Sequence, residues 1–228
     1  MIKFTKVDKV YKGGQKSLAD VNLGIQQGEF VFLVGHSGAG KSTMLKLLLR
    51  EEKVSSGRLT VLGSDISKIK NNNIHLLRRK IGVIFQDYKL LKDKTAYENV
   101  ELAMRVIGSN PKKIKPRVLE VLEQVGLLDK ANRYPSQLSG GECQRVAIAR
   151  AIVNKPSIVI ADECTGNLDL HNSIEIIKIL NKINQNGTTI IMATHDTELL
   201  KMFEKRTIEL KNGQVVSDTK GEDYETDI

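Results

Sequence analysis

The stretch EFVFLVGHSGAGKSTMLKLLLR, from Glu29 to Arg50, decides the fold of this chain. EFVFLVG is a nearly continuous apolar run closed by glycine, which is typical of a strand buried on both faces. KSTMLKLLLR is apolar nearly all round and predicts a buried helix. Between them GHSGAGKS, Gly35 to Ser42, matches G-x-x-x-x-G-K-[ST] in full, so the sequence predicts a phosphate-binding P-loop.

The P-loop pattern also predicts how each residue acts. Gly35, Gly38 and Gly40 let the backbone wrap around a phosphate with its N–H groups pointing inward. The N-terminus of the following helix adds its dipole, Lys41 reaches the β- and γ-phosphates, and the Ser42 hydroxyl binds Mg²⁺. The nucleotide-binding residues predicted in this loop are Gly35, His36, Ser37, Gly38, Ala39, Gly40, Lys41, Ser42 and Thr43.

Two further apolar runs, PSIVIAD and GTTIIMATH, predict buried strands that end at Asp162 and near His195. Together with the first run they indicate an α/β fold with a mainly parallel core sheet, whose ligands bind at the C-terminal ends of the strands. There Asp162 is expected to hold Mg²⁺ through its water shell, and Glu163 to polarise the attacking water as general base. A solvated acidic pair is the alternative, and the neighbouring P-loop argues against it.

His195 and Gln86 also follow apolar, strand-like runs. His195 shares the sheet edge with the P-loop, which favours a contact to the γ-phosphate over a purely structural role. Gln86 follows RRKIGVIF and is a candidate ligand of Mg²⁺ or of the attacking water. The predicted catalytic residues are therefore Glu163, His195 and Gln86, and the predicted metal ligands are Ser42, Gln86 and Asp162.

The remaining segments predict an antiparallel β subdomain and an inserted helical subdomain. Met1 to Gln26 and GRLTVLGSD, which begins at Gly57, alternate like antiparallel strands. From about residue 89 to 155 the pattern is helical, with IKPRVLEVLEQVGLL amphipathic and Gly126 a candidate helix cap. In NSIEIIKILNKIN the predicted apolar face contains Ile176, Ile179, Leu180 and Ile183. The whole chain, residues 1–228, is expected to be one domain with a disordered acidic tail at 217–228.

Composition limits the class of protein. The chain has 228 residues, long enough for a core without disulfides, and its two cysteines form neither a disulfide framework nor a zinc cluster, so a reducing cytosol fits. No apolar stretch is long enough to span a bilayer, and no signal peptide is indicated. The net charge of +8 indicates solubility, or attraction to an anionic partner.

A second glycine turn, LSGGECQRVAIARA, runs from Leu138 to Ala151 and also opens a helical pattern. The P-loop, the Gln86 loop, LSGGE, the strand IVIADE, the GNLD turn ending at Asp169, and His195 occur in the order and spacing of ABC-type ATPases. The chain therefore resembles that family from about residue 2 to residue 214. The resemblance implies the ABC ATPase fold and hydrolysis of ATP to ADP and phosphate with Mg²⁺.

By this resemblance the second glycine turn belongs to a shared site. In ABC ATPases two subunits pack head to tail, and the signature LSGGE of each contacts the γ-phosphate held by the other. The similarity implies an ATP-dependent dimer with a second copy of this chain, Tyr11 stacked on adenine, and Asp169 acting across the interface. An ordinary strand tyrosine is the alternative for Tyr11. The signature residues assigned to nucleotide binding are Ser139, Gly140, Gly141 and Glu142.

LLRRKIGVIFQDYKLLKDKTAYENV, from Leu76 to Val100, is similar to the FtsE-type family of cell-division ATPases. AMRVIG and RAIVNKP support the same resemblance, whereas TGNLD resembles the wider subgroup of lipoprotein-release, macrolide-export and cell-division ATPases. The FtsE-type resemblance implies a cytoplasmic, peripheral membrane protein at the division site, which controls cell-wall hydrolysis through an FtsX-like integral membrane partner. That partner is expected to dock near Tyr88–Val100; a solvated loop is the alternative reading of this segment.

Two other classes remain as alternatives. An export or lipoprotein-release ATPase of the macrolide-export type would differ in its membrane partner. A DNA-repair or chromosome-structuring head also carries such a signature, but it needs a long coiled coil that this chain lacks, so no nucleic acid is expected. Two basic clusters are read as solvated faces, with attraction to an anionic membrane as the alternative: Lys68, Lys70, Arg78, Arg79 and Lys80, and Lys112, Lys113, Lys115 and Arg117.

Both cysteines stand where FtsE-like sequences usually have other residues, Cys143 in place of Gln and Cys164 in place of Pro. Natural drift is the favoured explanation. The sharper hypothesis is that Cys143, in the first turn of a helix, has a lowered thiol pKa. Loss of the proline at position 164 is also expected to loosen the turn that leads from Glu163 to Asp169.

Overall fold

The computed structural model describes residues 1–219, which fall into two compact units. Unit 1 contains residues 1–77 together with the chain from residue 191 onward, and unit 2 contains residues 78–190. The predicted P-loop and His195 lie in unit 1, whereas the predicted Gln86 loop, signature and Asp162 lie in unit 2. Each unit is therefore described by itself.

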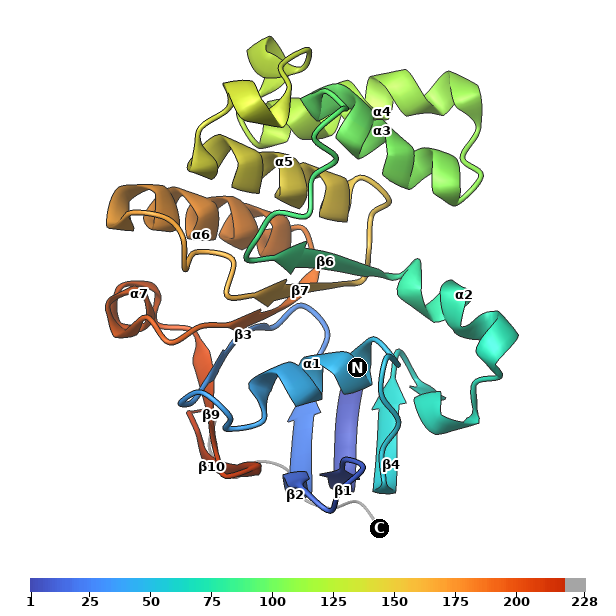
Figure 1. Cartoon of the computed structure of the whole chain (residues 1–228), viewed down its shortest axis with the longest axis vertical. Coiled ribbons are helices and arrows are strands. Elements are labelled where there is room, and N and C mark those ends of the chain that lie inside the picture. Colours follow the sequence, from blue (N-terminus) through green and yellow to red (C-terminus); the bar gives the residue numbers. More distant parts are fainter. Residues whose placement is uncertain (220–228) are drawn as a thin grey trace. The chain divides into compact units, whose positions relative to one another are not determined.

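The antiparallel sheet of unit 1 has the strand order β2-β1-β4-β5 (Figure 1). Its first strand alternates between buried and exposed positions, and Ile2, Phe4 and Val7 point into the core. The predicted antiparallel β subdomain is thus confirmed. The strands are β1 (Ile2–Val10), β2 (Lys16–Ile25), β4 (Ser56–Val61) and β5 (Ser64–Asp65).

A second sheet of unit 1 carries the P-loop. Its strands follow in the order β10-β9-β3-β8, with β3 parallel to β9 and β9 antiparallel to β10. Helix α1 packs against β2 within this unit. The strands are β3 (Phe30–Val34), β8 (Thr189–Ala193, of which the part from Ile191 belongs to unit 1), β9 (Arg206–Lys211) and β10 (Gln214–Asp218); the helical elements are α1 (Lys41–Leu48), η1 (Ile66–Lys68), η2 (Asn71–Asn73), α2 (Ile74–Arg78) and α7 (Thr197–Phe203).

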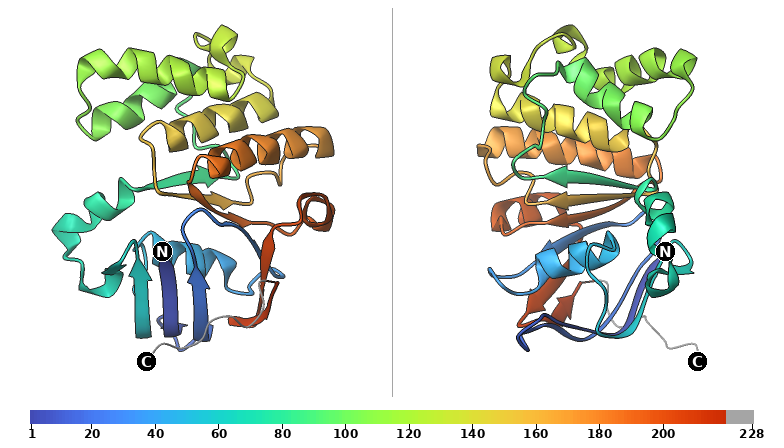
Figure 2. Two further views of the ribbon diagram at one scale, coloured as in Figure 1. Left: turned by 180° about the vertical axis from the view of Figure 1, so that it is seen from behind. Right: turned by 45° about the vertical axis from the view of Figure 1, so that its right-hand side comes forward.

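Unit 2 stacks helices on a parallel strand pair. Strands β6 and β7 pair in parallel, α5 contacts both β6 and α6, and α3 and α4 pack against α5 (Figures 1 and 2). The elements are β6 (Ile81–Phe85), α3 (Ala96–Val106), α4 (Pro111–Gln124), η3 (Leu128–Lys130), η4 (Pro135–Gln137), α5 (Gly140–Ile152), β7 (Ile158–Asp162) and α6 (Leu170–Gln185).

Most predicted elements are confirmed, with differences in detail. Helix α4 ends at Gln124, and Gly126 just beyond it has a φ of 70°, the left-handed conformation expected of a glycine that caps a helix end. On α6 the buried apolar residues are Ile176, Ile177 and Leu180. The predicted apolar face omitted Ile177 and included Ile179, which is only partly buried. Among the described residues no helix has the length and apolar character needed to cross a bilayer.

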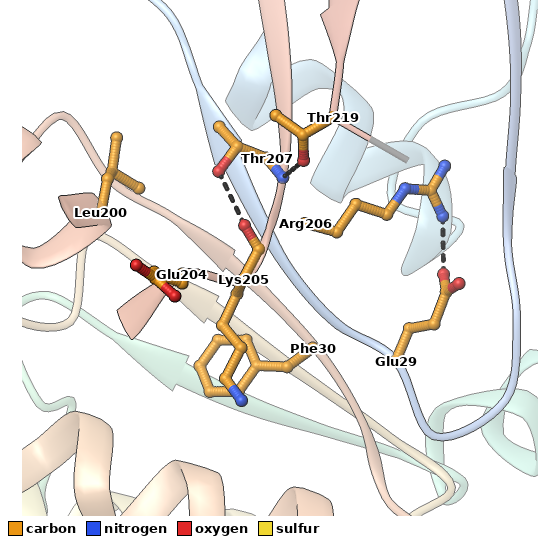
Figure 3. Close-up of a pocket in the computed structure, with 8 residues that line it drawn as sticks. All are labelled: Glu29, Phe30, Leu200, Glu204, Lys205, Arg206, Thr207 and Thr219. Atoms are coloured by element: carbon orange, nitrogen blue, oxygen red, sulfur yellow. Dashed lines mark hydrogen bonds and ion pairs between the residues drawn. The ribbon is translucent and has the colours of Figure 1, made fainter. Parts of the chain in front are cut away.

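The predicted disordered tail is wrong at its start. Ser217 and Asp218 belong to β10, and Asp218 accepts two hydrogen bonds from the Arg206 guanidinium. Arg206 also donates to Glu29, which fixes the start of β9 beside the start of β3 (Figure 3). This side chain is only 8% exposed, so the charges compensate one another in a nearly dry environment. The tail from residue 220 lies outside the described residues.

A shallow hollow of about 580 Å³ adjoins this ion-pair network (Figure 3). It is lined by Phe30, Glu204 and Arg206, which lie at or before the N-terminal ends of β3 and β9. The P-loop follows the C-terminal end of β3, so this hollow is not the predicted nucleotide site.

Two glycines with the same φ of 78° allow a test of backbone crowding in the antiparallel sheet. A Cβ on Gly57 would overlap the Lys6 carbonyl, whereas a Cβ on Gly63 meets nothing within 4 Å. Gly63→Ala should lower the free energy of unfolding by about 1–2 kcal/mol through left-handed strain alone. Gly57→Ala should cost about 2–5 kcal/mol, because overlap adds to the strain.

Urea unfolding followed by circular dichroism checks this pair, with Gly63→Ala as the matched control. Equal losses of stability in the two variants would contradict the account of Gly57.

Candidate functional site

The P-loop of unit 1 leaves the N-terminus of α1 open. Gly40 is its N-cap with a φ of 111°, and no side chain caps the helix. Lys41 is 7% exposed and donates to the carbonyls of Gly35 at 2.6 Å and His36 at 3.3 Å. The first N–H groups of a helix need acceptors, so an uncapped N-terminus beside a buried ammonium suits an anion.

The glycines of this loop serve different purposes. A side chain on Gly35 would overlap the Leu210 carbonyl, and one on Gly40 would come within 2.8 Å of the Ser17 carbonyl. The backbone of the loop is therefore packed against β9 and β2. Gly38 is different, because a Cβ there meets nothing within 4 Å. Its φ of 79°, and not crowding, is the reason for glycine at this position.

Unit 1 brings Tyr11 to the P-loop. Its hydroxyl lies 3.3 Å from the Thr43 hydroxyl, which also bonds Ser17 at 2.7 Å. The ammonium of Lys9 lies 4.8 Å from the centre of the Tyr11 ring, a cation–π contact. Lys9 is in turn fixed by Glu52 at 2.7 Å. No local pattern indicates the role of Lys9, because its partner Glu52 is 43 residues away.

His195 lies at the same strand end as the P-loop. The Thr194 N–H donates to the carbonyl of Leu33, in the strand that leads into the loop. Thr194 also orients the next turn, since its hydroxyl accepts from the Asp196 N–H and Asp196 caps α7. His195 itself is exposed. The predicted common edge for His195 and the P-loop is thus present within unit 1.

Unit 2 places Gln86 beside the end of β7. Phe85 and Asp162 are paired residues of the parallel strands, so Gln86 and Glu163 both follow the same edge. Gln86 and Asn167 exchange two hydrogen bonds, at 3.5 Å from the Gln86 amide to the Asn167 oxygen and at 3.3 Å in return to the Gln86 carbonyl. The GNLD turn therefore positions Gln86.

Glu163 is held in a tight turn. Its φ is 47°, uncommon for a residue other than glycine, and its carbonyl accepts from the Gly166 N–H at 3.0 Å. Gly166 has a reason to be glycine, because a Cβ there would lie 2.9 Å from the Gln86 amide nitrogen. The turn forms with Cys164 in place of proline; its predicted loosening stays a prediction.

The signature helix, α5, is capped by its own residues. The Ser139 hydroxyl accepts from the Glu142 N–H at 3.3 Å, and the Glu142 carboxylate accepts from the Ser139 N–H at 2.8 Å. This reciprocal pair is a capping box. Lys130 forms an ion pair with Glu142, and together with the Ser139 N–H it lowers the pKa of that carboxyl. Lys130 was not predicted.

Asn172 joins the signature to Asp169. Asp169 caps α6 by accepting from the Asn172 N–H at 2.8 Å, and the Asn172 amide donates to the other carboxylate oxygen at 2.7 Å. These bonds lower the pKa of Asp169. The Asn172 amide oxygen also abuts Gly141, where a Cβ would come within 2.5 Å. Asn172 was missed because only the packing of α5 on α6 reveals it.

One predicted solvated cation points inward. The Arg117 guanidinium is 14% exposed and donates to the carbonyls of Val153 at 2.9 Å and Ile152 at 3.1 Å, and to Glu120 at 2.7 Å. It closes the C-terminal end of α5, where the last carbonyls lack helical partners. The interpretation of Arg117 as part of a solvated basic face is therefore wrong.

Comparison with known proteins identifies the class. Residues 18–166 match the family described as ABC transporter. The chain therefore belongs to the ABC family, and it is an ATPase of that family. The resemblance predicted from the motifs is confirmed.

Curated relatives align over nearly the whole chain. The chain is 52% identical over 223 residues to the cell division ATP-binding protein FtsE of Streptococcus pneumoniae serotype 2 (strain D39 / NCTC 7466), covering 97% of each. It is 50% identical to FtsE of Bacillus subtilis (strain 168), covering 98% of each. Identity to FtsE of Escherichia coli (strain K12) is 48%, covering 94% of this chain and 97% of the relative.

Solved structures share the fold. A dimeric post-hydrolysis state of the ATP-binding cassette MJ0796 bound to ADP and Pi matches with a TM-score of 0.84 and 38% identity, covering 96% of this chain and 97% of the other. The protein cbiO1 of Clostridium perfringens, part of the ABC transporter complex cbiONQ, matches with a TM-score of 0.90 and 30% identity, covering 95% of this chain and 87% of the other. The predicted α/β ABC ATPase fold is thereby confirmed.

The structure corrects the hypothesis about Cys143. Burial, and then the charge of Glu142, raise the pKa of its thiol instead of lowering it, and the thiol donates to the Pro135 carbonyl at 3.6 Å. Burial raises the pKa of Cys164 to about 12. Position in a first helical turn lowers a thiol pKa only where the sulfur keeps enough solvent to ionise.

Both thiols should therefore resist alkylation in the folded chain. A raised pKa lowers the thiolate fraction at a given pH, and the thiolate is the nucleophile. At about pH 8 we expect iodoacetamide to react with these two thiols at least about tenfold more slowly than with free cysteine. Mass spectrometry measures the extent of alkylation over time. Denaturing guanidinium chloride, as control, should release both thiols; native reaction at the model-thiol rate would contradict this.

Proposed function

We propose that this chain is the ATP-binding and ATP-hydrolysing subunit of an FtsEX-like complex, which dimerises on ATP. The observation that carries the proposal is a difference between two glycine-containing helix starts, at α1 and at α5. The N-terminus of α1 has no side-chain cap, whereas α5 carries the signature glycines behind its own Ser139 cap. The dimeric state of the MJ0796 cassette supports dimerisation of this chain.

In this proposal each active site combines two chains. One chain holds the phosphates with its P-loop residues, and Tyr11 stacks on adenine with the ring face that Lys9 leaves uncovered. The other chain brings Ser139, Gly140 and Gly141 to the γ-phosphate and Asp169 to the interface. Because Asn172 contacts both Gly141 and Asp169, these interface elements move together.

The residues present fit a magnesium ion, since hydroxyl, amide and carboxylate oxygens are its usual protein ligands. Ser42, Gln86 and Asp162 would hold it, and the ion would neutralise charge on the β- and γ-phosphates. Glu163 polarises the attacking water as general base, His195 contacts the γ-phosphate, and Gln86 orients the water. The backbone of Glu163 is held in a tight turn, with a φ of 47°.

The proposed output is cell division. Relatives named cell division ATP-binding protein share 48–52% of their residues with this chain over nearly its full length, which supports an FtsX-like integral membrane partner and control of cell-wall hydrolysis. The chain would then lie on the cytoplasmic face of the membrane, peripherally, at the division site.

The docking segment, residues 88–100, has a preformed shape. The buried side chain of Asn99 accepts from the Leu91 N–H at 2.8 Å and donates to the carbonyls of Leu91, Lys94 and Thr95 at 3.0–3.1 Å. Thr95 caps α3 in a capping box with Glu98. Leu91 remains 41% exposed on this rigid loop, which suits a partner that inserts an apolar contact.

Glu163→Gln tests the shared site. It should bind ATP normally, hydrolyse it about 10²- to 10⁴-fold more slowly, and elute in size exclusion as a dimer of the 25.4 kDa chain. Lys41→Ala is the control and should lose ATP binding and remain monomeric. If Glu163→Gln stays monomeric at saturating Mg-ATP, with and without the membrane partner, the shared-site proposal fails.

Leu91→Glu tests the docking segment. A charge on this exposed leucine should abolish co-purification with the FtsX-like protein from membranes. Leu128→Glu, which alters a similarly exposed leucine (44%) outside the segment, is the control. Equal capture by both variants contradicts docking at 88–100, and capture of an exporter-type membrane protein instead contradicts the cell-division role.

A further inference from the structure

Arg150 links the docking segment to the signature helix, in addition to the packing of α3 against α5. The Arg150 guanidinium, near the C-terminal end of α5, donates to the Tyr88 carbonyl at 2.7 Å and to the Lys89 carbonyl at 2.5 Å. Burial lowers the pKa of Arg150, and no carboxylate within the described residues forms an ion pair with it. The carbonyls of Tyr88 and Lys89 thus accept hydrogen bonds from a half-buried guanidinium, and these bonds offset part of its cost of burial.

The segment adopts a costly backbone to make these bonds. Tyr88 has a φ of 59° and Lys89 a φ of 49°, two consecutive left-handed residues that are not glycine. Single left-handed residues of this kind are uncommon, and a pair persists only where its surroundings fix it. The Arg150 guanidinium donates to both carbonyls and thereby stabilises this conformation.

Tyr88 contacts the opposite end of the same helix. A Cβ built on Gly140 would lie 2.9 Å from the Tyr88 hydroxyl, so that hydroxyl rests directly against the first residue of the signature helix. Burial, and then the charge of Cys143 one turn further along α5, raise the pKa of Tyr88. One residue of the docking segment therefore reaches both ends of α5.

We propose that Arg150 and Tyr88 are positioning residues that tie the docking segment to the signature helix, so that the position of the segment sets the position of Gly140. A partner that displaces the segment breaks the two Arg150 bonds and withdraws the hydroxyl from Gly140. This inference rests on the proposed shared site, and it identifies the signature, rather than Gln86 alone, as the element through which docking regulates that site.

The test follows the segment directly. In a Cys143→Ser, Cys164→Ser, Glu163→Gln chain, Lys92→Cys is labelled with an environment-sensitive fluorophore, since Lys92 is exposed within the segment. Its emission should change when ATP drives dimerisation. Arg150→Met should abolish that change and raise the dimer dissociation constant about tenfold, while the affinity of the monomer for ATP stays within about twofold.

Two variants separate positioning from folding. Arg150→Lys keeps the charge and one of the two bonds, so it should restore part of the fluorescence change. Arg133→Met, which removes an exposed arginine of the same unit, should behave like the parent. The positioning role is overturned if Arg150→Met lowers thermal stability and weakens dimerisation and ATP binding to the same extent.

A double-mutant cycle tests the Tyr88 contact in the monomer, without reliance on the shared site. Gly140→Ala should lower thermal stability with Tyr88 present and lower it less with Tyr88→Phe, because the phenylalanine removes the atom that the new Cβ would meet. Additive effects overturn the contact.

The outcomes distinguish this inference from the proposed function. If the parent dimerises on ATP but the label does not respond, or if Arg150→Met responds like the parent, the inference is wrong and the shared site stands. If no dimer forms, both are wrong.

Discussion

The free N–H groups at the start of α1 are the constraint on which the site depends. A helix begins with backbone donors that lack helical partners, and they need acceptors. At α5, α6 and α7 the residues Ser139, Asp169 and Asp196 supply these acceptors from their own side chains. At α1 the cap is Gly40, which has no side chain, and the neighbouring Lys41 adds positive charge. Among the α-helices of residues 1–219 with an assigned N-cap, α3 to α7 have a side-chain cap and α1 does not, which leaves the start of α1 for a phosphate.

This contrast changes the meaning of the signature. The serine before its two glycines resembles an anion-binding turn in sequence, yet its hydroxyl already accepts a hydrogen bond inside the capping box. Gly140 and Gly141 are small for local reasons as well, since Tyr88 and Asn172 occupy the space that side chains would need. The signature is thus a rigid surface held by neighbouring side chains, and its glycines keep that surface flat enough for another chain to approach.

The sequence predicted what depends on local pattern. The P-loop, the buried strands, the antiparallel subdomain and the αL cap at Gly126 all rest on residues within a few positions of one another. The family resemblance supplied the role of Asp169, whereas the strand ends had already made Gln86 and His195 candidates. Lys9, Lys130, Arg150 and Asn172 escaped prediction because their partners are distant in sequence or lie on another helix. Cys143 and Arg117 were misjudged because burial, which is a tertiary property, reversed what their positions suggested.

The central claim is that a P-loop and a signature from different chains meet around one ATP. Two Glu163→Gln chains with different tags, both free of native cysteines, test it when one carries Ser37→Cys and the other Ser139→Cys. A short bifunctional thiol reagent should join the two chains only in the mixture and only when ATP is present. Cross-linking that is absent from the ATP-containing mixture, or that forms only within a single chain carrying both substitutions, would contradict the account.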